Sequence, residues 1–248
     1  EMLSQLEKEE ADWDVAFGVS ADALEEGKEY WQTGKDAWTG YSAVSFVILY
    51  NTNVVTYREL PTGWDSLLEP RWKGRVAVPD PLKSDMAASV LTEAAKNSEK
   101  EEFLDLLAEN MQYQMPETFK EVEQGISDGR YSIGVTSEEA AKAMLAAGQD
   151  VDYIDPEEGE CFFEDGTAIR KRTPNLDASE AFVTYTICDD TKWLLRTQLL
   201  RQPAEDVAAE NDRSDEDLKQ RYSRQQEVLN IWKLIMEEKS GSAHEQEQ

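Results

Sequence analysis

Short apolar runs alternate with longer amphipathic stretches along most of the chain. The runs have the length and composition of strands and cover residues 13–19, 41–51, 76–78, 131–135, 151–154 and 161–169. Between them, apolar residues recur at helical spacing in the segments 84–96, 99–111, 117–126, 137–147, 175–188 and 190–200. Strands that alternate with helices usually pair in parallel through crossover connections. The pattern therefore predicts an α/β protein with mainly parallel sheets.

Three of the strands are followed by a helix start that carries a hydroxyl side chain, at Ser20, Ser84 and Thr136. Thr136 with Glu139 also has the spacing of a capping box. A helix N-terminus presents unpaired backbone N–H groups, and the end of a strand is where open α/β proteins bind small, preferably anionic, ligands. Simple capping is the commoner role of such residues, and the two roles are compatible.

Two long β-rich stretches, 41–51 and 151–169, are able to connect separate lobes. The first is continuously apolar, as expected of a strand buried on both faces, and the second contains a predicted turn at Asp165-Gly166. With the three strand-to-helix junctions, these crossing strands predict two lobes that share a cleft. The expected division is a first lobe in 1–45, a second lobe in 46–155, a return to the first lobe in 156–200, and a C-terminal helical region with a polar tail in 201–248.

Two helices show clear apolar faces for packing. In the helix at 175–188 the expected inner face is formed by Ala178, Ala181, Phe182 and Tyr185. In the last helix, 215–239, a stripe that should dock on the body of the protein contains Leu218, Tyr222, Leu229, Trp232 and Met236.

The charge balance restricts the partners. Asp plus Glu number 52 against 25 Lys plus Arg, which gives a net charge of −27. Such a negative potential argues against nucleic acids and anionic membrane surfaces as partners. It is typical of a solubilising surface on an extracellular or salt-tolerant protein. The longest apolar run, from Ala43 to Tyr50, has the length of a strand and is too short to span a membrane.

The residues of common catalytic and metal sites are missing from the sequence. The only histidine, His244, lies in the polar tail, which excludes a Ser-His-Asp system, and the two cysteines, Cys161 and Cys188, lack metal-ligand spacing. These cysteines either form a disulfide with each other or remain as two free thiols. No phosphate-binding glycine motif occurs. The sequence thus favours binding without a metal or cofactor over catalysis.

One segment resembles a known family. Residues 64–76, WDSLLEPRWKGRV, followed by Asp80-Pro81 and Ser84, are similar to bacterial ABC-transporter solute-binding proteins of the ferric-iron, aminoalkylphosphonate and sugar-phosphate group. Further segments agree with this family in the same order: 14–18 with 20–23, 133–136, 156–159, 165–169 with 174–175, and 201–203 with 206–207. The resemblance implies a two-lobe periplasmic-binding-protein fold, a monomer outside the cytoplasm, a small-molecule ligand in the interlobe cleft and an ABC permease as partner.

The same resemblance implies a set of ligand contacts. They are Ser20, Ser84, Asp85, Thr136, Ser137 and Glu138, with Tyr41 as a residue for which packing is an equal alternative. Iron-binding members carry two adjacent tyrosines after the strand that matches 131–135, where this chain has Glu138-Glu139. The ligand is therefore expected to be a phosphate-bearing or other organic anion, and Glu138 is expected to accept from a hydroxyl or amine.

Other interpretations remain open at this point. The same fold could serve as the sensor domain of a membrane receptor, or bind ferric iron without tyrosines, and turnover of a phosphate ester is a third alternative. Members of the family also begin with a strand, a helix and a strand before the region that matches residues 1–12. The chain is expected either to be a fragment or to manage without this piece.

Overall fold

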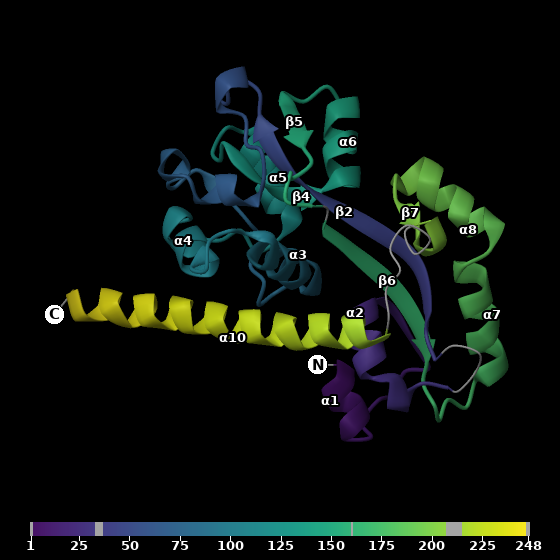
Figure 1. Cartoon of the computed structure of the whole chain (residues 1–248). Helices are drawn as coiled ribbons and strands as arrows, with labels where there is room; N and C mark the ends of the chain where they lie inside the picture. The colour runs from purple at the N-terminus through teal and green to yellow at the C-terminus, as the bar shows by residue number, and fades with distance from the viewer. Residues whose placement is uncertain (1, 33–36, 160, 207–214, 247–248) are drawn as a thin grey trace. The chain divides into compact units, whose positions relative to one another are not determined.

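The computed structural model describes residues 2–32, 37–159, 161–206 and 215–246. The chain divides into two compact units (Figure 1). Unit 1 contains residues 1–44 and 163–223, and unit 2 contains residues 45–162 and 224–248. Each boundary falls inside a regular element, namely β2 (Thr39–Asn51), β6 (Cys161–Ile169) and α10 (Asp215–Gln246). Hydrogen bonds link the strands in the order β1-β6-β2-β4-β3, and β5 and β7 also pair with β2.

Unit 1 is built around the antiparallel pair of β1 and β6. Strand β1 covers Val15–Ser20, and the other elements of the unit are α1 (Met2–Glu7), α2 (Ala21–Glu26), η1 (Lys28–Tyr30), α7 (Leu176–Thr186), α8 (Asp189–Leu194), the π-helical turn η5 (Leu195–Leu199) and β7 (Gln202–Pro203). The pairing runs from Val15 opposite Ile169 to Ser20 opposite Asp165, with a register shift at Gly18, whose φ is +71°.

The turn predicted at Asp165-Gly166 is wrong, because both residues lie within β6. The glycine at position 166 is explained by packing. A Cβ at Gly166 would lie 2.5 Å from Cδ1 of Leu24, so the absence of a side chain lets α2 approach the strand closely.

One face of the β1–β6 pair is covered by an apolar cluster formed by Leu6, Ala16, Leu24, Trp31 and Ala168. Trp31 is fully buried, and its Nε1 donates to the carbonyl oxygen of Leu24 at 2.8 Å. The predicted inner face of α7 is wrong: only Ser179 and Thr186 of this helix are buried, while Phe182 and Tyr185 are exposed. Periodicity identified the apolar side of α7, but it carries no information on what covers that side.

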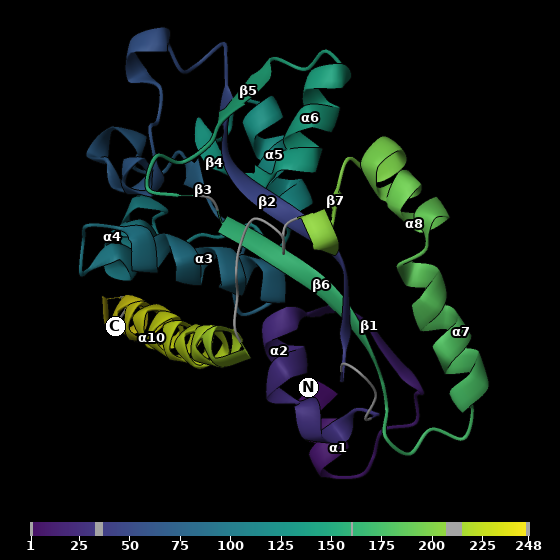
Figure 2. The same ribbon diagram turned by 45° about the vertical axis from the view of Figure 1, so that its right-hand side comes forward.

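Unit 2 contains a parallel pair of strands. β3 (Val76–Ala77) runs parallel to β4 (Ile133–Ser137), whereas β2 is antiparallel to both β4 and β5 (Val151–Ile154). β4 and β5 therefore point in the same direction with β2 between them, and α6 (Glu138–Ala146) connects them (Figure 2). The α/β class is confirmed, but the prediction of mainly parallel sheets is wrong for the pairings that the structure describes. The alternation of strands and helices in the sequence correctly predicts one direction for β3, β4 and β5, but it does not predict that β2 lies between β4 and β5.

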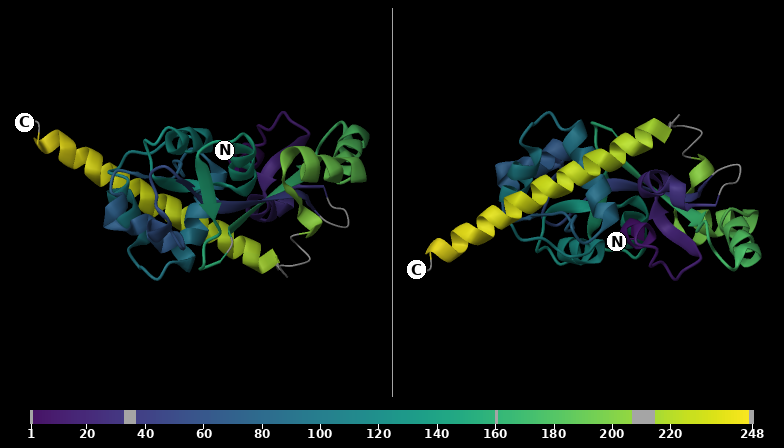
Figure 3. Two further views of the ribbon diagram at one scale, coloured as in Figure 1. Left: turned by 90° about the horizontal axis from the view of Figure 1, so that it is seen from above. Right: turned by 90° about the horizontal axis from the view of Figure 1, so that it is seen from below.

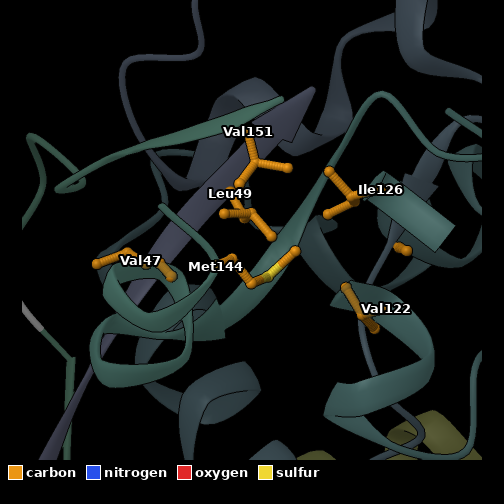
Figure 4. Close-up of a cluster of buried hydrophobic side chains, with 8 residues drawn as sticks. Val47, Leu49, Val122, Ile126, Met144 and Val151 are labelled. Atoms are coloured by element: carbon orange, nitrogen blue, oxygen red, sulfur yellow. The ribbon is translucent and has the colours of Figure 1, made fainter. Parts of the chain in front are cut away.

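The core of unit 2 lies between this sheet and two helices, α5 (Phe119–Ser127) and α6. Figure 4 shows its apolar side chains converging, and the buried members are Val47, Leu49, Ala77, Val122, Ile126, Ala141, Met144 and Val151. Gly134 in β4 makes the close packing of α5 feasible. A Cβ there would lie 2.5 Å from the carbonyl oxygen of Ala77 and 2.9 Å from Cγ1 of Val122.

The remaining elements of unit 2 are η2 (Tyr57–Glu59), η3 (Trp64–Leu68), η4 (Pro70–Trp72), α3 (Asp85–Asn97) and α4 (Phe103–Asn110). The part of α10 in this unit passes α3 and α4 (Figure 3). Gln225 Nε2 donates to the main-chain oxygen of Asp85 at 3.3 Å, and the Lys239 ammonium lies 4.9 Å from the Tyr113 ring centroid.

The docking stripe of α10 differs in part from the predicted one. Its buried side chains are those of Leu218, Gln225, Val228, Trp232 and Ile235, while Tyr222, Leu229 and Met236 are half-buried. In the described residues, no helix combines the length and the apolar character needed to cross a membrane.

Candidate functional site

Three helix N-termini of unit 2 lie at one edge of its sheet. β3 leads through residues 78–84 into α3, and β4 leads directly into α6. Because β3 and β4 are parallel neighbours, their carboxyl ends lie at the same edge. The start of α5 joins them there, since Asp80 N donates to Pro116 O at 2.9 Å. This edge, formed by residues 80–85, 116–119 and 136–138, is called the β4 edge below.

Each of these helices has a capping side chain. The hydroxyl oxygens of Ser84, Thr118 and Ser137 accept hydrogen bonds from the main-chain N–H three residues later, at 3.3, 3.2 and 3.4 Å. The cap at Ser84 is confirmed. The cap at Thr136 is wrong by one residue, because β4 continues through Ser137, which pairs with Phe46 of β2. Caps satisfy only some of the first N–H groups, so the three helix ends keep unpaired donors at the β4 edge, although each helix also has an acidic residue in its first turn.

Thr136 has another role. It is fully buried, and its hydroxyl donates to Oε1 of Glu123 at 2.7 Å. Burial raises the pKa of the Glu123 carboxyl, although the bond from Thr136 and the charge of Lys120 act in the opposite direction. Nothing in the sequence singles out Glu123, because it is one of two acidic residues in an amphipathic pattern within α5.

The other predicted contacts at the β4 edge differ in their surroundings. Glu138 forms an ion pair with Lys142 at 2.6 Å. Two effects raise the pKa of Tyr153: the larger is burial of its phenol, and the second is the negative charge of Glu138. The side chain of Ser137 is buried, whereas that of Asp85 is exposed.

In unit 1, Ser20 ends β1 and caps α2, with its Oγ accepting from Ala23 N at 3.3 Å, as predicted. Its partner across the strands is Asp165, which is buried and accepts from Ser42 Oγ at 3.0 Å and from Arg201 Nη2 at 2.5 Å. The pairing of β7 with β2 fixes the chain beside Arg201. Neither Asp165 nor Arg201 was among the predicted contacts.

Tyr41 belongs to the same group in unit 1. Its ring stacks on Phe17, with centroids 4.8 Å apart. Burial, followed by the charge of Asp165, raises the pKa of Tyr41 to about 12. The phenol therefore keeps its proton at neutral pH and can donate a hydrogen bond. It is poorly suited to act as a tyrosinate ligand.

Two further observations concern metals and thiols. Within the described ranges, no group of three or more His, Cys, Asp and Glu residues is arranged to hold a metal ion. Cys188 carries a free thiol and so forms no disulfide with Cys161. Hydrogen bonds from Thr191 lower the pKa of the Cys188 thiol.

Comparison with known protein families shows that residues 15–226 match one family model, which is described as bacterial extracellular solute-binding protein. Among solved structures, the chain is similar to a ferric binding protein from Campylobacter jejuni, with a TM-score of 0.76, 15% identity, and coverage of 94% of this chain and 87% of that one. No curated protein sequence matches the chain.

Two other solved structures are similar. The periplasmic binding protein AfuA from Actinobacillus pleuropneumoniae, with exogenous fructose-6-phosphate bound, has a TM-score of 0.77 at 15% identity, covering 95% of this chain and 87% of that one. A two-component system protein that mediates signal transduction has a TM-score of 0.68 at 19% identity, covering 88% and 79%. At such identities, these likenesses show the fold of a periplasmic binding protein and nothing about the ligand.

Proposed function

Because this chain belongs to the bacterial extracellular solute-binding protein family, we propose that it captures a small, anionic solute and hands it to the permease of an ABC importer. The single observation that supports an anion is the meeting of three helix N-termini at the β4 edge. Helix N-termini favour anions because their free N–H groups and the helix dipole both point at the ligand.

The proposed contacts follow from the position of each side chain. In unit 2 they are Ser84, Asp85, Ser137 and Glu138, and Thr136 acts through Glu123. In unit 1 they are Ser20 and Tyr41, to which we add the guanidinium of Arg201. The interlobe cleft implied by the family resemblance would bring both sets to one ligand. Phosphate-bearing and phosphonate-bearing solutes are the favoured anions, because no pair of adjacent tyrosines follows β4.

A pair of variants at Ser84 tests this proposal. Asn and Asp both cap helices as well as Ser does, but only Asp places a negative charge at the N-terminus of α3. We expect Ser84→Asn to keep the affinity for fructose 6-phosphate and 2-aminoethylphosphonate within about threefold, and Ser84→Asp to weaken it by about tenfold or more.

Isothermal titration calorimetry of both variants and the unchanged protein measures the effect, with ferric citrate as a third solute. Thermal unfolding of each variant checks the cap itself. Equal affinities in Ser84→Asn and Ser84→Asp, or binding of ferric citrate alone, would contradict the proposed anion site.

A further inference from the structure

We propose that Glu123 contacts the captured solute, that Thr136 positions it, and that the solute consequently carries a hydroxyl or ammonium group that donates to Glu123. This inference deepens the proposed function and rests on it. It adds a specificity-determining residue that lies outside the sequence-predicted contacts.

Glu123 is held in place by the packing of α5. Gly134 allows this helix to lie directly on β4, and Val122 and Ile126 anchor it in the core. One turn before Glu123, on the same side of the helix, Phe119 stacks on Phe46 with centroids 5.6 Å apart. Phe46 is the strand partner of Ser137 at the β4 edge. The Glu123 side chain therefore starts from a rigid helix beside the proposed solute position.

The bond from Thr136 decides which chemistry Glu123 can recognise. A threonine hydroxyl has one hydrogen, and here it goes to Oε1 of Glu123. Thr136 thus has no hydrogen left to offer an anion. The second carboxylate oxygen, Oε2, has no hydrogen-bond partner among the described residues, and an ionised carboxylate only accepts. A solute group that contacts Oε2 must therefore be a donor.

Glu138, an acidic residue at the β4 edge, differs from Glu123 in its charged partners. Glu138 already has an ion pair with Lys142, which balances its negative charge. Glu123 has no ion pair in the part of the chain that the structure describes, although Lys120 lies on the same helix. Glu123 is half-buried, so water solvates its negative charge only in part. A hydrogen bond from a donor on the solute would offset this loss of solvation.

A set of three solutes with the same anionic group tests the inference. Ethylphosphonate, 2-hydroxyethylphosphonate and 2-aminoethylphosphonate differ only in the donor at the second carbon. We expect calorimetry of the full chain to show that the two donor-bearing compounds bind about tenfold tighter than ethylphosphonate. In Glu123→Gln this preference should fall to about threefold or less for the amine.

Two further sets of variants separate positioning from stability. Thr136→Val removes the donor to Glu123 at similar volume and should lower the preference, and Thr136→Ser should restore it. Asp128→Asn removes an exposed carboxylate at the other end of the same helix, away from the β4 edge, and should leave the preference unchanged. The ratio of two affinities is the readout, because a general loss of folded protein reduces both affinities together.

The outcomes distinguish the two proposals. If the unchanged protein binds all three phosphonates equally, or if Glu123→Gln keeps the full preference, the role of Glu123 is overturned while the anion site stands. If the unchanged protein binds none of them, the proposed anion class fails, and the inference about Glu123 fails with it.

Discussion

Tyr41 illustrates how a single side chain is tuned by its surroundings. Its ring is held against Phe17, and its hydroxyl lies near the buried carboxylate of Asp165. Desolvation and the like charge both penalise the tyrosinate form. The residue is therefore a neutral donor at every physiological pH, as an anionic solute would require of it.

The raised pKa of Tyr41 predicts a specific alkaline response. Below pH 10 the phenol is protonated in both the folded and the unfolded state, so its full contribution to stability is present. Between pH 10 and the folded-state pKa of about 12, only the unfolded state loses the proton, and the free energy of unfolding falls as pH rises.

Near-ultraviolet absorbance titration should show one tyrosine that ionises near pH 12, and this step should be missing in Tyr41→Phe. Urea unfolding at several alkaline pH values should show a smaller decline in the variant than in the unchanged protein. Ionisation of all tyrosines at their ordinary pKa in the folded state would contradict the burial of Tyr41.

At the same scale, the sequence predicted what local spacing determines. Ser20 and Ser84 cap helices as expected, because a cap involves residues only three positions apart. Thr136 and Ser137 are both hydroxyl residues, and the choice between them depends on how far β2 pairs along β4. The roles of Asp165 and Arg201 depend on contacts with residues distant in sequence, and no local sequence pattern predicts these contacts.

Among the elements, the contact between α5 and β4 is the one on which the β4 edge depends. The two elements approach so closely that the backbone at Gly134 has no room for a methyl group. The same contact determines the position of Glu123. A small change at Gly134 should therefore affect both stability and solute binding.

Gly134→Ala should lower the free energy of unfolding by about 2 kcal/mol, because overpacking shifts β3 or α5. Gly148→Ala is the matched comparison. Nothing lies within 4 Å of its Cβ position, but its φ is +73°, so that only backbone strain of about 1 kcal/mol is expected. Urea denaturation measures both values. A loss in Gly134→Ala no greater than in Gly148→Ala would show that the packing adapts.

The element-scale prediction from sequence was right about class and wrong about pairing. Alternating strands and helices correctly indicated that β3, β4 and β5 run in one direction. The place of β2 between β4 and β5 is set by a tertiary contact. Its continuous apolar run indicates burial on both faces, but it contains no information on the direction of its neighbours.

For the whole molecule, the net charge of −27 is the dominant electrostatic property. Several lysines and arginines are already used in ion pairs, such as Lys73 with Glu109 and Arg196 with Asp206. The excess of acidic residues therefore remains as mutual repulsion in the folded state.

We expect the melting temperature to rise by several degrees as NaCl is increased from about 0.01 M to about 0.5 M, because salt screens this repulsion. Differential scanning calorimetry provides the measurement. The double variant Glu99→Lys/Glu101→Lys, which changes two exposed positions, should reduce the salt dependence. A melting temperature that is constant or falls with salt would contradict the electrostatic argument.

The division of the chain between the units has a consequence for its order of synthesis. The strands β3, β4 and β5 and their partner segment of β2 all lie within residues 45–162, so this sheet is complete before Phe163 leaves the ribosome. β1 pairs only with β6 in the described structure, and Val15 must wait for Ile169. During translation, β1 is therefore an unpaired strand from the synthesis of Ser20 until that of β6, and that interval is when a chaperone would bind it.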